Sequence, residues 1–383
     1  MAPGKILLFA NTTWYLYNFR RSLAERLRSE GWEVVLLSPP DEYGQRLEEL
    51  GFRWLPFYFS TRSTNPFNEF LVILRLIKLN LREKPDLVHN FTIKCVLYGS
   101  LAARFTNKPP VVNGVTGMGH IFTDSGLKAR ILRPLVRRLY RFIFSTPDTR
   151  VIFQNTDDLN YFLKANLLEN NNARLIRGSG VNTSLFLPHA VKDVISEKPV
   201  TILFASRLLF EKGILELVAA AHLLKKKGLN AVVHIAGEMY PGNPSSLTQN
   251  DIDDITKQNV VTFLGHVDDM QQLIADSDIV VLPSYREGTP RILIEAAAMA
   301  KPIVATDIPG CAGLVVDGVN GLLVPVRESV ALADALTTLI ADAALRTRFG
   351  RAGREIVLSE FDETIVIRKT CAIYRELTRG RDA

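Results

Sequence analysis

The segment IVVLPSYREGTPRILIE, residues 279–295, decides the fold of this chain. Its apolar, β-branched start is typical of a buried strand that ends at Pro283. The turn Gly288-Thr289-Pro290 then predicts a helix that starts near Thr289, with Pro290 at the first helical position, where its missing N–H costs no hydrogen bond. A buried strand that leads through a tight turn into a helix is the repeating unit of parallel α/β sheets.

The same alternation runs along the whole chain. We expect strands at residues 5–10, 33–38, 87–91, 110–115, 151–154 and 174–176, and a second series at 201–206, 232–236, 261–264, 279–283, 303–306 and 322–324. Strands that alternate with helical patterns predict βαβ units. The fold class is therefore α/β, with two Rossmann-like, doubly wound parallel-sheet domains that face each other across a cleft at the carboxyl ends of their strands.

A polar, Pro-bounded stretch separates the two series and predicts the domain limits. We expect an N-terminal domain over residues 1–186, a linker over 187–199, a second domain over 200–360 and a C-terminal helix over 361–383 that packs back on the first domain. A length of 383 residues agrees with this division, because one hydrophobic core rarely grows so large.

The composition excludes several classes of protein. With 47% hydrophobic and 22% charged residues, the chain is neither disordered nor fibrous. Its 3 Cys are too scattered for a disulfide framework or a zinc site, which indicates a reducing compartment. The longest charge-free run, residues 109–123, is too short to span a bilayer, and we predict a cytoplasmic location.

The net charge of +6 hides an asymmetry between the two halves. Residues 1–192 carry 26 Lys or Arg and 15 Asp or Glu, a net +11, whereas residues 193–383 carry 20 and 25, a net −5. So basic an N-terminal half is expected to face nucleic acid, a lipid surface or a phosphorylated substrate. Composition alone leaves these three open.

Charged side chains follow strands of the second half. Arg207 comes after the strand at 201–206, and Lys212 opens the next helix; a guanidinium fork and an ammonium point charge both suit a diphosphate. Glu287 and Glu295 flank a helix start that favours anionic ligands such as phosphate. A carboxylate is unfavourable beside such a ligand unless it binds hydroxyl groups, so these two are expected to bind the hydroxyls of two sugars of one ligand. The alternative is a solvated acidic turn and a surface glutamate.

Together with Asp307-Ile-Pro-Gly310 and Asn320-Gly321, these residues resemble the nucleotide-sugar domain of family 4 glycosyltransferases with the GT-B fold. The resemblance covers nearly the whole chain. It implies that Arg207 and Lys212 hold the donor diphosphate and stabilise the leaving group, that Glu295 binds the ribose hydroxyls, and that Glu287 contacts the donor sugar. It also implies that the backbone of Gly288, Thr289 and Pro290 lies along the sugar and phosphate, and that Val267 forms a wall for the base.

The resemblance implies a metal-independent reaction as well, with a UDP-sugar as co-substrate and no cofactor. Positive side chains and a helix dipole can neutralise a departing diphosphate in place of a metal ion. The sequence has no HExxH motif and no His/Cys cluster, so we predict no metal ligand.

Three segments at strand ends of the first half are candidates for acceptor binding. Asn11 and Thr12 follow the first strand, and either contact the acceptor or cap the next helix. Lys94 could meet an acceptor phosphate or be a solvated lysine. Within family 4 the segments around Lys94 and His120 look most like the subgroup that adds N-acetylgalactosamine or a similar sugar to a lipid-diphosphate-linked glycan. The resemblance to other family 4 enzymes, which have a histidine in the corresponding loop, implies that His120 bonds a hydroxyl of the donor sugar or the transferred group; the alternative is a structural histidine.

A basic amphipathic helix is expected over residues 127–144. It carries six cations and no acid: Lys128, Arg130, Arg133, Arg137, Arg138 and Arg141. Such a helix can lie on an anionic membrane, each nearby cation contributing about 1 kcal/mol, or it can cover the sheet with a solvated basic face. A second basic amphipathic pattern at residues 69–82 favours peripheral association with the inner face of the cytoplasmic membrane.

The prediction is therefore a retaining glycosyltransferase that moves a sugar from a UDP-sugar to a polyprenyl-diphosphate-linked saccharide in cell-surface or protein-glycan assembly. The expected sugar is an N-acetylhexosamine such as N-acetylgalactosamine. Three alternatives remain: a family 4 transferase with another donor or a soluble acceptor, a GT-B sugar-nucleotide epimerase, and a nucleic-acid-binding module, of which no recognised motif is present.

Overall fold

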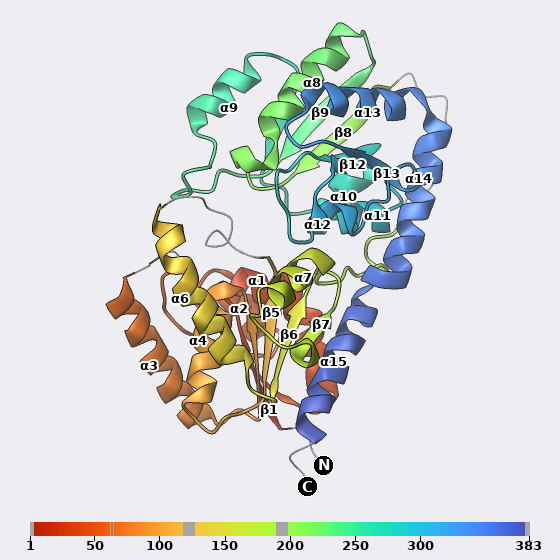
Figure 1. Cartoon of the computed structure of the whole chain (residues 1–383). Helices are drawn as coiled ribbons and strands as arrows, with labels where there is room; N and C mark the ends of the chain where they lie inside the picture. The colour runs from red at the N-terminus through yellow and green to blue at the C-terminus, as the bar shows by residue number, and fades with distance from the viewer. Residues whose placement is uncertain (1–3, 62, 64, 118–126, 189–197, 380–383) are drawn as a thin grey trace. The chain divides into compact units, whose positions relative to one another are not determined.

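The computed structural model divides the chain into two compact units, which are described separately. The first comprises residues 1–179 and 364–383, and the second residues 180–363. The structure describes residues 4–61, 63, 65–117, 127–188 and 198–379, and no side chain of residues 127–132 (Figure 1).

The first unit is built on a seven-stranded sheet with the order β3-β2-β1-β4-β5-β6-β7. Every pairing in it is parallel. Its strands are β1 (Lys5–Phe9), β2 (Glu33–Ser38), β3 (Arg53–Pro56), β4 (Leu87–Phe91), β5 (Val111–Val115), β6 (Thr149–Phe153) and β7 (Ala173–Leu175). The chain reverses its direction of winding between β1 and β4, which are neighbours, and ligands of such sheets bind at that point, outside the carboxyl ends of the strands.

Helices cover both faces of this sheet, so its strands are apolar on both sides. Ile6 and Leu8 of β1 pack in one core, with α1 (Thr13–Ser29), α2 (Tyr43–Glu49) and α15 (Glu363–Arg379). Leu7 and Phe9 point into the opposite core. That core is shared with α3 (Pro66–Glu83), α4 (Ile93–Arg104), α6 (Leu127–Phe144) and α7 (Thr156–Lys164).

The helix α15 is separated in sequence from the sheet that it covers. The hydroxyl of Tyr374 lies 2.5 Å from Nδ1 of His89 on β4, inside the core. Burial, with a smaller contribution from the charge of Arg20, lowers the pKa of His89 well below its usual value, so this imidazole is neutral at pH 7. His89 therefore holds α15 on the sheet and does not titrate near neutral pH.

The second unit has a six-stranded parallel sheet with the order β10-β9-β8-β11-β12-β13. Its strands are β8 (Val200–Ala205), β9 (Ala231–Ala236), β10 (Thr262–Gly265), β11 (Ile279–Leu282), β12 (Ile303–Thr306) and β13 (Gly321–Val324). Its helices are α8 (Ile214–Lys226), α9 (Gln249–Thr256), α10 (Met270–Ala275), α11 (Arg291–Ala298), α12 (Pro309–Ala312), α13 (Ser329–Ala341) and α14 (Ala343–Ile356). The direction of winding reverses between β8 and β11, the two strands that carry Arg207, Lys212 and Glu287 on their following loops.

The structure departs from the sequence predictions at three places. The edge strand β3 was not predicted. Pro290 is the N-cap of α11 and not its first residue, because its ψ of 116° is still extended and the helix begins at Arg291. The units divide at residues 179 and 180, earlier than the limit predicted at residue 186, because Val181 pairs with Phe361 and Asp362 in the second unit. Of the linker predicted at residues 187–199, residues 189–197 lie outside the described residues.

Candidate functional site

Two loops of the second unit come together at the point where its winding reverses. One follows β8 and contains Lys212 in a 3-10 turn, Phe210–Lys212; the other follows β11 and contains Glu287. The backbone of Gly213 has a φ of 75°, and a Cβ built on it would lie 2.1 Å from the carbonyl oxygen of Pro283. Only glycine allows this close approach, which sets the 3-10 turn against the end of β11.

Lys212 and Glu287 form an ion pair across these loops. Nζ of Lys212 lies 2.5 Å from Oε1 of Glu287, and Oγ of Ser284 donates to the same oxygen at 2.8 Å. The side chains of Lys212 and Glu287 are only 11% and 12% exposed, so the pair is held largely out of water. The sequence-based alternative, a solvated acidic turn, is therefore wrong for Glu287.

Arg207 lies in the same loop as Lys212 but is exposed. Its guanidinium carbon lies 4.9 Å from the centre of the Tyr240 ring, a stacking contact that fixes the group without burying it. A Cβ on Gly237 would lie 1.8 Å from the carbonyl oxygen of Ser206, so the ends of β8 and β9 also meet closely here. The loop thus presents one exposed and one buried cation.

Glu295 is buried in α11 and paired with Arg291, whose Nε donates to Oε1 at 2.6 Å. Burial raises the pKa of the Glu295 carboxyl, and Arg291 opposes that rise. Glu295 is therefore no surface glutamate. Its partner is one turn earlier on its own helix, so the structure shows Glu287 and Glu295 with different cations.

The remaining donor-side candidates lie around these groups. Gly288 and Thr289 are half-buried, and Pro290 is buried ahead of α11. A Cβ on Gly310 would meet the carbonyl oxygens of Glu287 and Gly288, at 2.5 and 2.7 Å, so the start of α12 packs directly against this backbone. Val267, after β10, is half-buried and packs against the hydrophobic core of the second unit.

In the first unit, Asn11 and Lys94 line a pocket of about 330 Å³ where β1, β4 and β5 end. The rest of its wall is formed by Thr61, Thr92, Ile93, Thr116 and Gly117. Thr12 lies next to it but serves α1 as the N-cap, since its Oγ1 accepts from the N–H of Tyr15 at 3.1 Å. The capping interpretation is thus correct for Thr12, whereas Asn11 faces the pocket.

Lys94 is not a solvated lysine, which was one of the two interpretations of the sequence. Its Nζ donates to the carbonyl oxygens of Ser60 and Ser63, at 2.8 and 2.6 Å, and lies 2.9 Å from Oε1 of Glu69. The other carboxylate oxygen of Glu69 accepts from the hydroxyl of Tyr98 at 2.6 Å. A phosphate at Lys94 would compete with this carboxylate.

The cations of α6 divide into groups with different surroundings. Arg137 donates to the hydroxyl of Tyr161 and Arg141 to the carbonyl oxygens of Ala165 and Asn166, so these two attach the helix to the unit. Arg138 is exposed. A hollow of about 300 Å³ is lined by Arg133, Pro134, Arg137 and Arg141. The helix is not interrupted at Pro134. His120 and the side chains of Lys128 and Arg130 lie outside the described residues.

Residues 5–155 match the family model "Glycosyl transferase 4-like", and residues 189–356 match "Glycosyl transferases group 1". This chain is a glycosyltransferase.

Two relatives of this glycosyltransferase are named for lipid-linked sugars. An N,N'-diacetylbacillosaminyl-diphospho-undecaprenol alpha-1,3-N-acetylgalactosaminyltransferase of Campylobacter jejuni is 29% identical over 95% of this chain and 96% of its own. A UDP-Gal:alpha-D-GlcNAc-diphosphoundecaprenol alpha-1,3-galactosyltransferase of Escherichia coli is 25% identical over 87% and 86%. The crystal structure of Anabaena HepE in complex with UDP-glucose has a TM-score of 0.75 at 20% identity, covering 98% and 99% of the chains. The predicted GT-B fold is confirmed.

The glycosyltransferase contains two Asp-x-Asp patterns, which in sequence could suggest metal ligands. Asp251 of the first caps α9 through Thr248, and Asp278 of the second accepts from the N–H of Thr201. Within the described part of the chain, no three His, Cys, Asp or Glu side chains are grouped so that they could hold a metal ion. Among the described helices, none has the length and apolarity needed to traverse a bilayer.

Two groups near the candidate sites were missed by sequence reasoning. Tyr285, between Ser284 and Glu287, donates its hydroxyl to Glu216 of α8 at 2.6 Å and so braces the Glu287 loop. Glu69, 25 positions before Lys94 in the sequence, forms an ion pair with it. Neither pairing has a local sequence signal, because the first depends on how the loop after β11 packs on α8 and the second on how α3 packs on α4.

Proposed function

We propose that this glycosyltransferase transfers a sugar from a UDP-sugar to a polyprenyl-diphosphate-linked saccharide, with retention of the anomeric configuration. The preferred sugar is an N-acetylhexosamine such as N-acetylgalactosamine. The observation that carries the donor half is the convergence of Lys212, Glu287 and Arg207 at the ends of β8 and β11. The acceptor half rests on the C. jejuni and E. coli relatives, whose names specify undecaprenol-diphosphate saccharides.

The donor diphosphate is placed at the two cations after β8. Arg207, stacked on Tyr240 and open to solvent, receives the phosphates first, and Lys212 supplies a second charge. As the bond from the anomeric carbon to the phosphate oxygen breaks, negative charge grows on the leaving diphosphate. A cation already held in place stabilises that charge without reorganisation, and this is the larger part of the rate enhancement. No metal ion is required for this role.

Glu287 and Glu295 are placed on the hydroxyl groups of the donor. Both hydrogen bonds described for Glu287 reach Oε1, so Oε2 is the atom we assign to a sugar hydroxyl. Glu295, held by Arg291, is assigned to the ribose, with Gly288, Thr289 and Pro290 along the sugar and phosphate and Val267 beside the base. HepE, which shares the fold, was solved with UDP-glucose, which supports a UDP-linked donor.

The transfer step is a front-face displacement. The acceptor oxygen bonds to the anomeric carbon on the face that the phosphate oxygen leaves, and the acceptor proton passes to that departing oxygen. This route fits the first unit, because no Asp or Glu is among the described residues that line the acceptor-side pocket. Asn11 and Lys94 are the residues assigned to the acceptor, and His120 is assigned to the transferred sugar.

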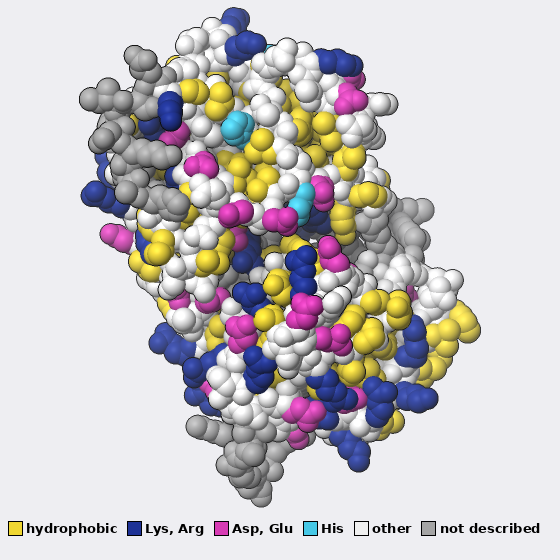
Figure 2. Space-filling view, turned by 180° about the vertical axis from the view of Figure 1, so that it is seen from behind, with side chains coloured by type: hydrophobic (Ala, Val, Ile, Leu, Met, Phe, Trp, Pro, Cys, Tyr) yellow, Lys and Arg dark blue, Asp and Glu magenta, His cyan; other side chains and the backbone are white. Residues whose placement is uncertain are grey.

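Peripheral membrane association follows from the acceptor. The exposed cations of α6, Arg138 above all, together with Lys128, Arg130, Arg133, Arg137 and Arg141, are assigned to the anionic inner face of the cytoplasmic membrane. Hydrophobic and basic side chains stand side by side on the surface of the first unit in Figure 2. We assign no nucleic-acid partner.

A donor panel tests the proposal. The enzyme is incubated with each of several UDP-sugars and a short polyprenyl-diphosphate saccharide, and the product is read by mass and by anomeric linkage. The expected result is a mass increase of one sugar in an α linkage from a UDP-N-acetylhexosamine. Conversion of the UDP-sugar without acceptor would instead indicate an epimerase. Transfer only to a soluble acceptor would show that the acceptor is not lipid-linked.

A further inference from the structure

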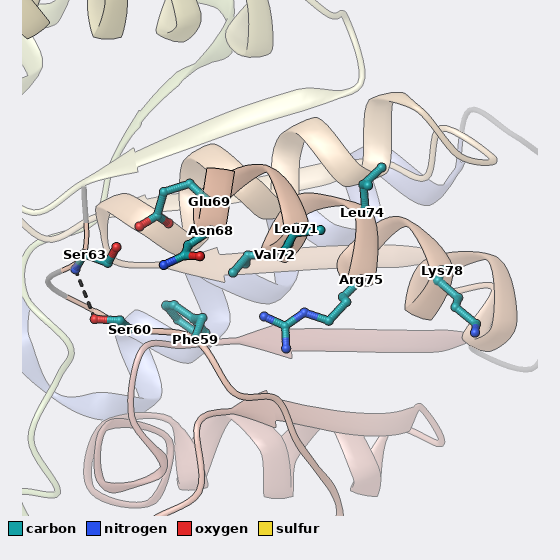
Figure 3. A pocket seen from close by; sticks show the side chains of 10 residues that line it. All are labelled: Phe59, Ser60, Ser63, Asn68, Glu69, Leu71, Val72, Leu74, Arg75 and Lys78. Carbon is teal, nitrogen blue, oxygen red and sulfur yellow. Dashed lines mark hydrogen bonds between the residues drawn. The ribbon is translucent and has the colours of Figure 1, made fainter. Parts of the chain in front are cut away.

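A groove runs beneath α3 on the first unit, next to the pocket of Asn11 and Lys94 but separate from it. It has a volume of about 630 Å³, within the range of small-molecule sites, roughly 300–1,000 Å³. As Figure 3 shows, Phe59 lies below Val72 at one end, and the side chains of Arg75 and Lys78 lie along the helix at the other. Leu71 and Leu74 complete its apolar wall.

The helix above this groove exposes large apolar side chains to water. Phe67 and Phe70 are 68% and 56% exposed, and Leu71, Leu74 and Leu81 are also exposed. Exposed apolar area of this kind costs about 25 cal/mol per Å² relative to burial, so a cluster of it on a monomer usually marks a contact surface. Between residues 66 and 82 the one acid is Glu69, whereas Arg75, Lys78 and Arg82 are basic. The partner is therefore apolar and anionic.

The groove and the polar pocket at the strand ends share one wall. Ser60 lines the groove and Thr61, the next residue, lines the pocket. Lys94, also in the pocket, bonds to Ser60, Ser63 and Glu69, all three of which line the groove. The ammonium group of Lys94 thus lies at the boundary between an apolar and a polar cavity.

We propose that the groove beneath α3 binds the isoprenoid chain of the acceptor next to its diphosphate. The saccharide then occupies the pocket lined by Asn11, and the diphosphate crosses the shared wall at Lys94, where it displaces the carboxylate of Glu69. This inference rests on the proposed function for the identity of the acceptor. An amphiphile with a diphosphate between chain and sugar matches the order of apolar groove, cation and polar pocket.

The test measures binding of farnesyl diphosphate to the full chain by calorimetry, with inorganic pyrophosphate and dodecyl phosphate as comparison probes. Wild type is expected to bind farnesyl diphosphate at least 10-fold more tightly than pyrophosphate. Leu74→Glu, inside the groove, is expected to lose most of that advantage. Leu81→Glu, similarly exposed on the same helix but outside the groove, is expected to keep it within twofold.

Lys94→Ala supplies the second half of the test. This variant is expected to bind pyrophosphate and farnesyl diphosphate more weakly by the same factor, because it removes the contact with the phosphates and leaves the contact with the isoprenoid chain. If Leu74→Glu does not fold by circular dichroism, Leu71→Glu replaces it, since Leu71 is also an exposed groove residue.

Three results would overturn the inference. They are equal affinity for farnesyl diphosphate and pyrophosphate, equal losses of affinity in Leu74→Glu and Leu81→Glu, and equal affinity for farnesyl diphosphate and dodecyl phosphate, which would mean that the groove takes any alkyl chain. None of these depends on sugar transfer. Failure of the donor panel with every lipid-diphosphate acceptor would instead remove the proposed function, whatever the affinity for farnesyl diphosphate.

Discussion

Lys212 Nζ and Glu287 Oε1 lie 2.5 Å apart although their residues are 75 positions apart in the chain. The pair joins the loops after β8 and β11, and its geometry depends on the glycine that follows Lys212. The same two charges that stabilise the free enzyme are those that we assign to the donor. Stability and catalysis are therefore coupled at this pair, and variants can separate them.

Replacement of Arg207 tests the diphosphate assignment most directly. Arg207→Ala is expected to lower kcat by about 100-fold, as loss of one preorganised donor does, while the folding free energy stays unchanged because the side chain is exposed. Arg351→Ala, an exposed arginine of α14, is the matched control and should be fully active. A near-normal rate for Arg207→Ala would remove this residue from the mechanism.

Breaking the Lys212–Glu287 pair should destabilise the protein. Lys212→Met leaves a largely buried carboxylate unpaired, at a cost of about 3 kcal/mol in unfolding free energy. The double variant Lys212→Met/Glu287→Gln removes both charges and should regain most of that stability in urea unfolding, but not the activity. Recovery of activity in the double variant would contradict a catalytic role for the cation.

The glycine after Lys212 should tolerate no side chain. Gly213→Ala combines a φ of 75° with a Cβ 2.1 Å from a backbone oxygen, so it should cost more than the roughly 1–2 kcal/mol of the left-handed conformation alone. Gly228 has a similar φ of 68°, but a Cβ built on it would have no atom within 4 Å. The Gly228→Ala variant therefore measures the cost of the left-handed conformation by itself. Equal destabilisation of the two variants by thermal unfolding would show that the close approach is unimportant.

The buried carboxyl of Glu295 should make stability depend on pH. Its pKa is raised by burial, so the folded protein binds its proton more tightly than the unfolded chain does. The protonated carboxyl therefore contributes to folding stability at pH values below the pKa of Glu295 in the unfolded chain. That contribution is lost as pH rises through the pKa of Glu295 in the folded protein. Urea unfolding of Glu295→Gln should therefore show that the variant gains stability relative to wild type between pH 4 and pH 7, about the range above an ordinary Glu pKa. A difference that does not change with pH would mean that Arg291 cancels the effect of burial.

Charge reversal on α6 tests membrane association. Arg138→Glu should weaken binding to anionic liposomes by about 10-fold or more at low salt, since each cation near the surface contributes about 1 kcal/mol. Lys226→Glu, an exposed site at the end of α8, is the control for net charge. Equal effects of the two reversals in a flotation assay would show that α6 has no special role.

The strand positions were predictable because strands that are buried on both faces are continuous apolar runs. β3 was missed because it is an edge strand of four residues, RWLP, in which Arg53 is exposed and Pro56 cannot donate to a ladder. The location of Lys212 and Glu287 after adjacent strands followed from the alternation of strands and helices. Their direct contact did not, because it depends on a backbone approach that only the fold reveals.

The surroundings of Lys94 and Glu295 were equally beyond a local pattern. Glu69 reaches Lys94 only because α3 packs on α4, and the burial of Glu295 depends on the elements around α11. A sequence shows which side chains are charged, but desolvation and partner choice are properties of the packed chain.

The return of α15 to the first unit has a consequence for the order of events during synthesis. Translation delivers residues 180–363, the whole second unit, before α15 leaves the ribosome. Until then the first sheet lacks the cover supplied by Val366, Tyr374 and Leu377, and the nascent chain carries an unfinished core beside a second unit that can already fold. The first unit to begin synthesis is the last to be completed, which makes its uncovered sheet face the part of the newborn enzyme most exposed to aggregation and to chaperone binding.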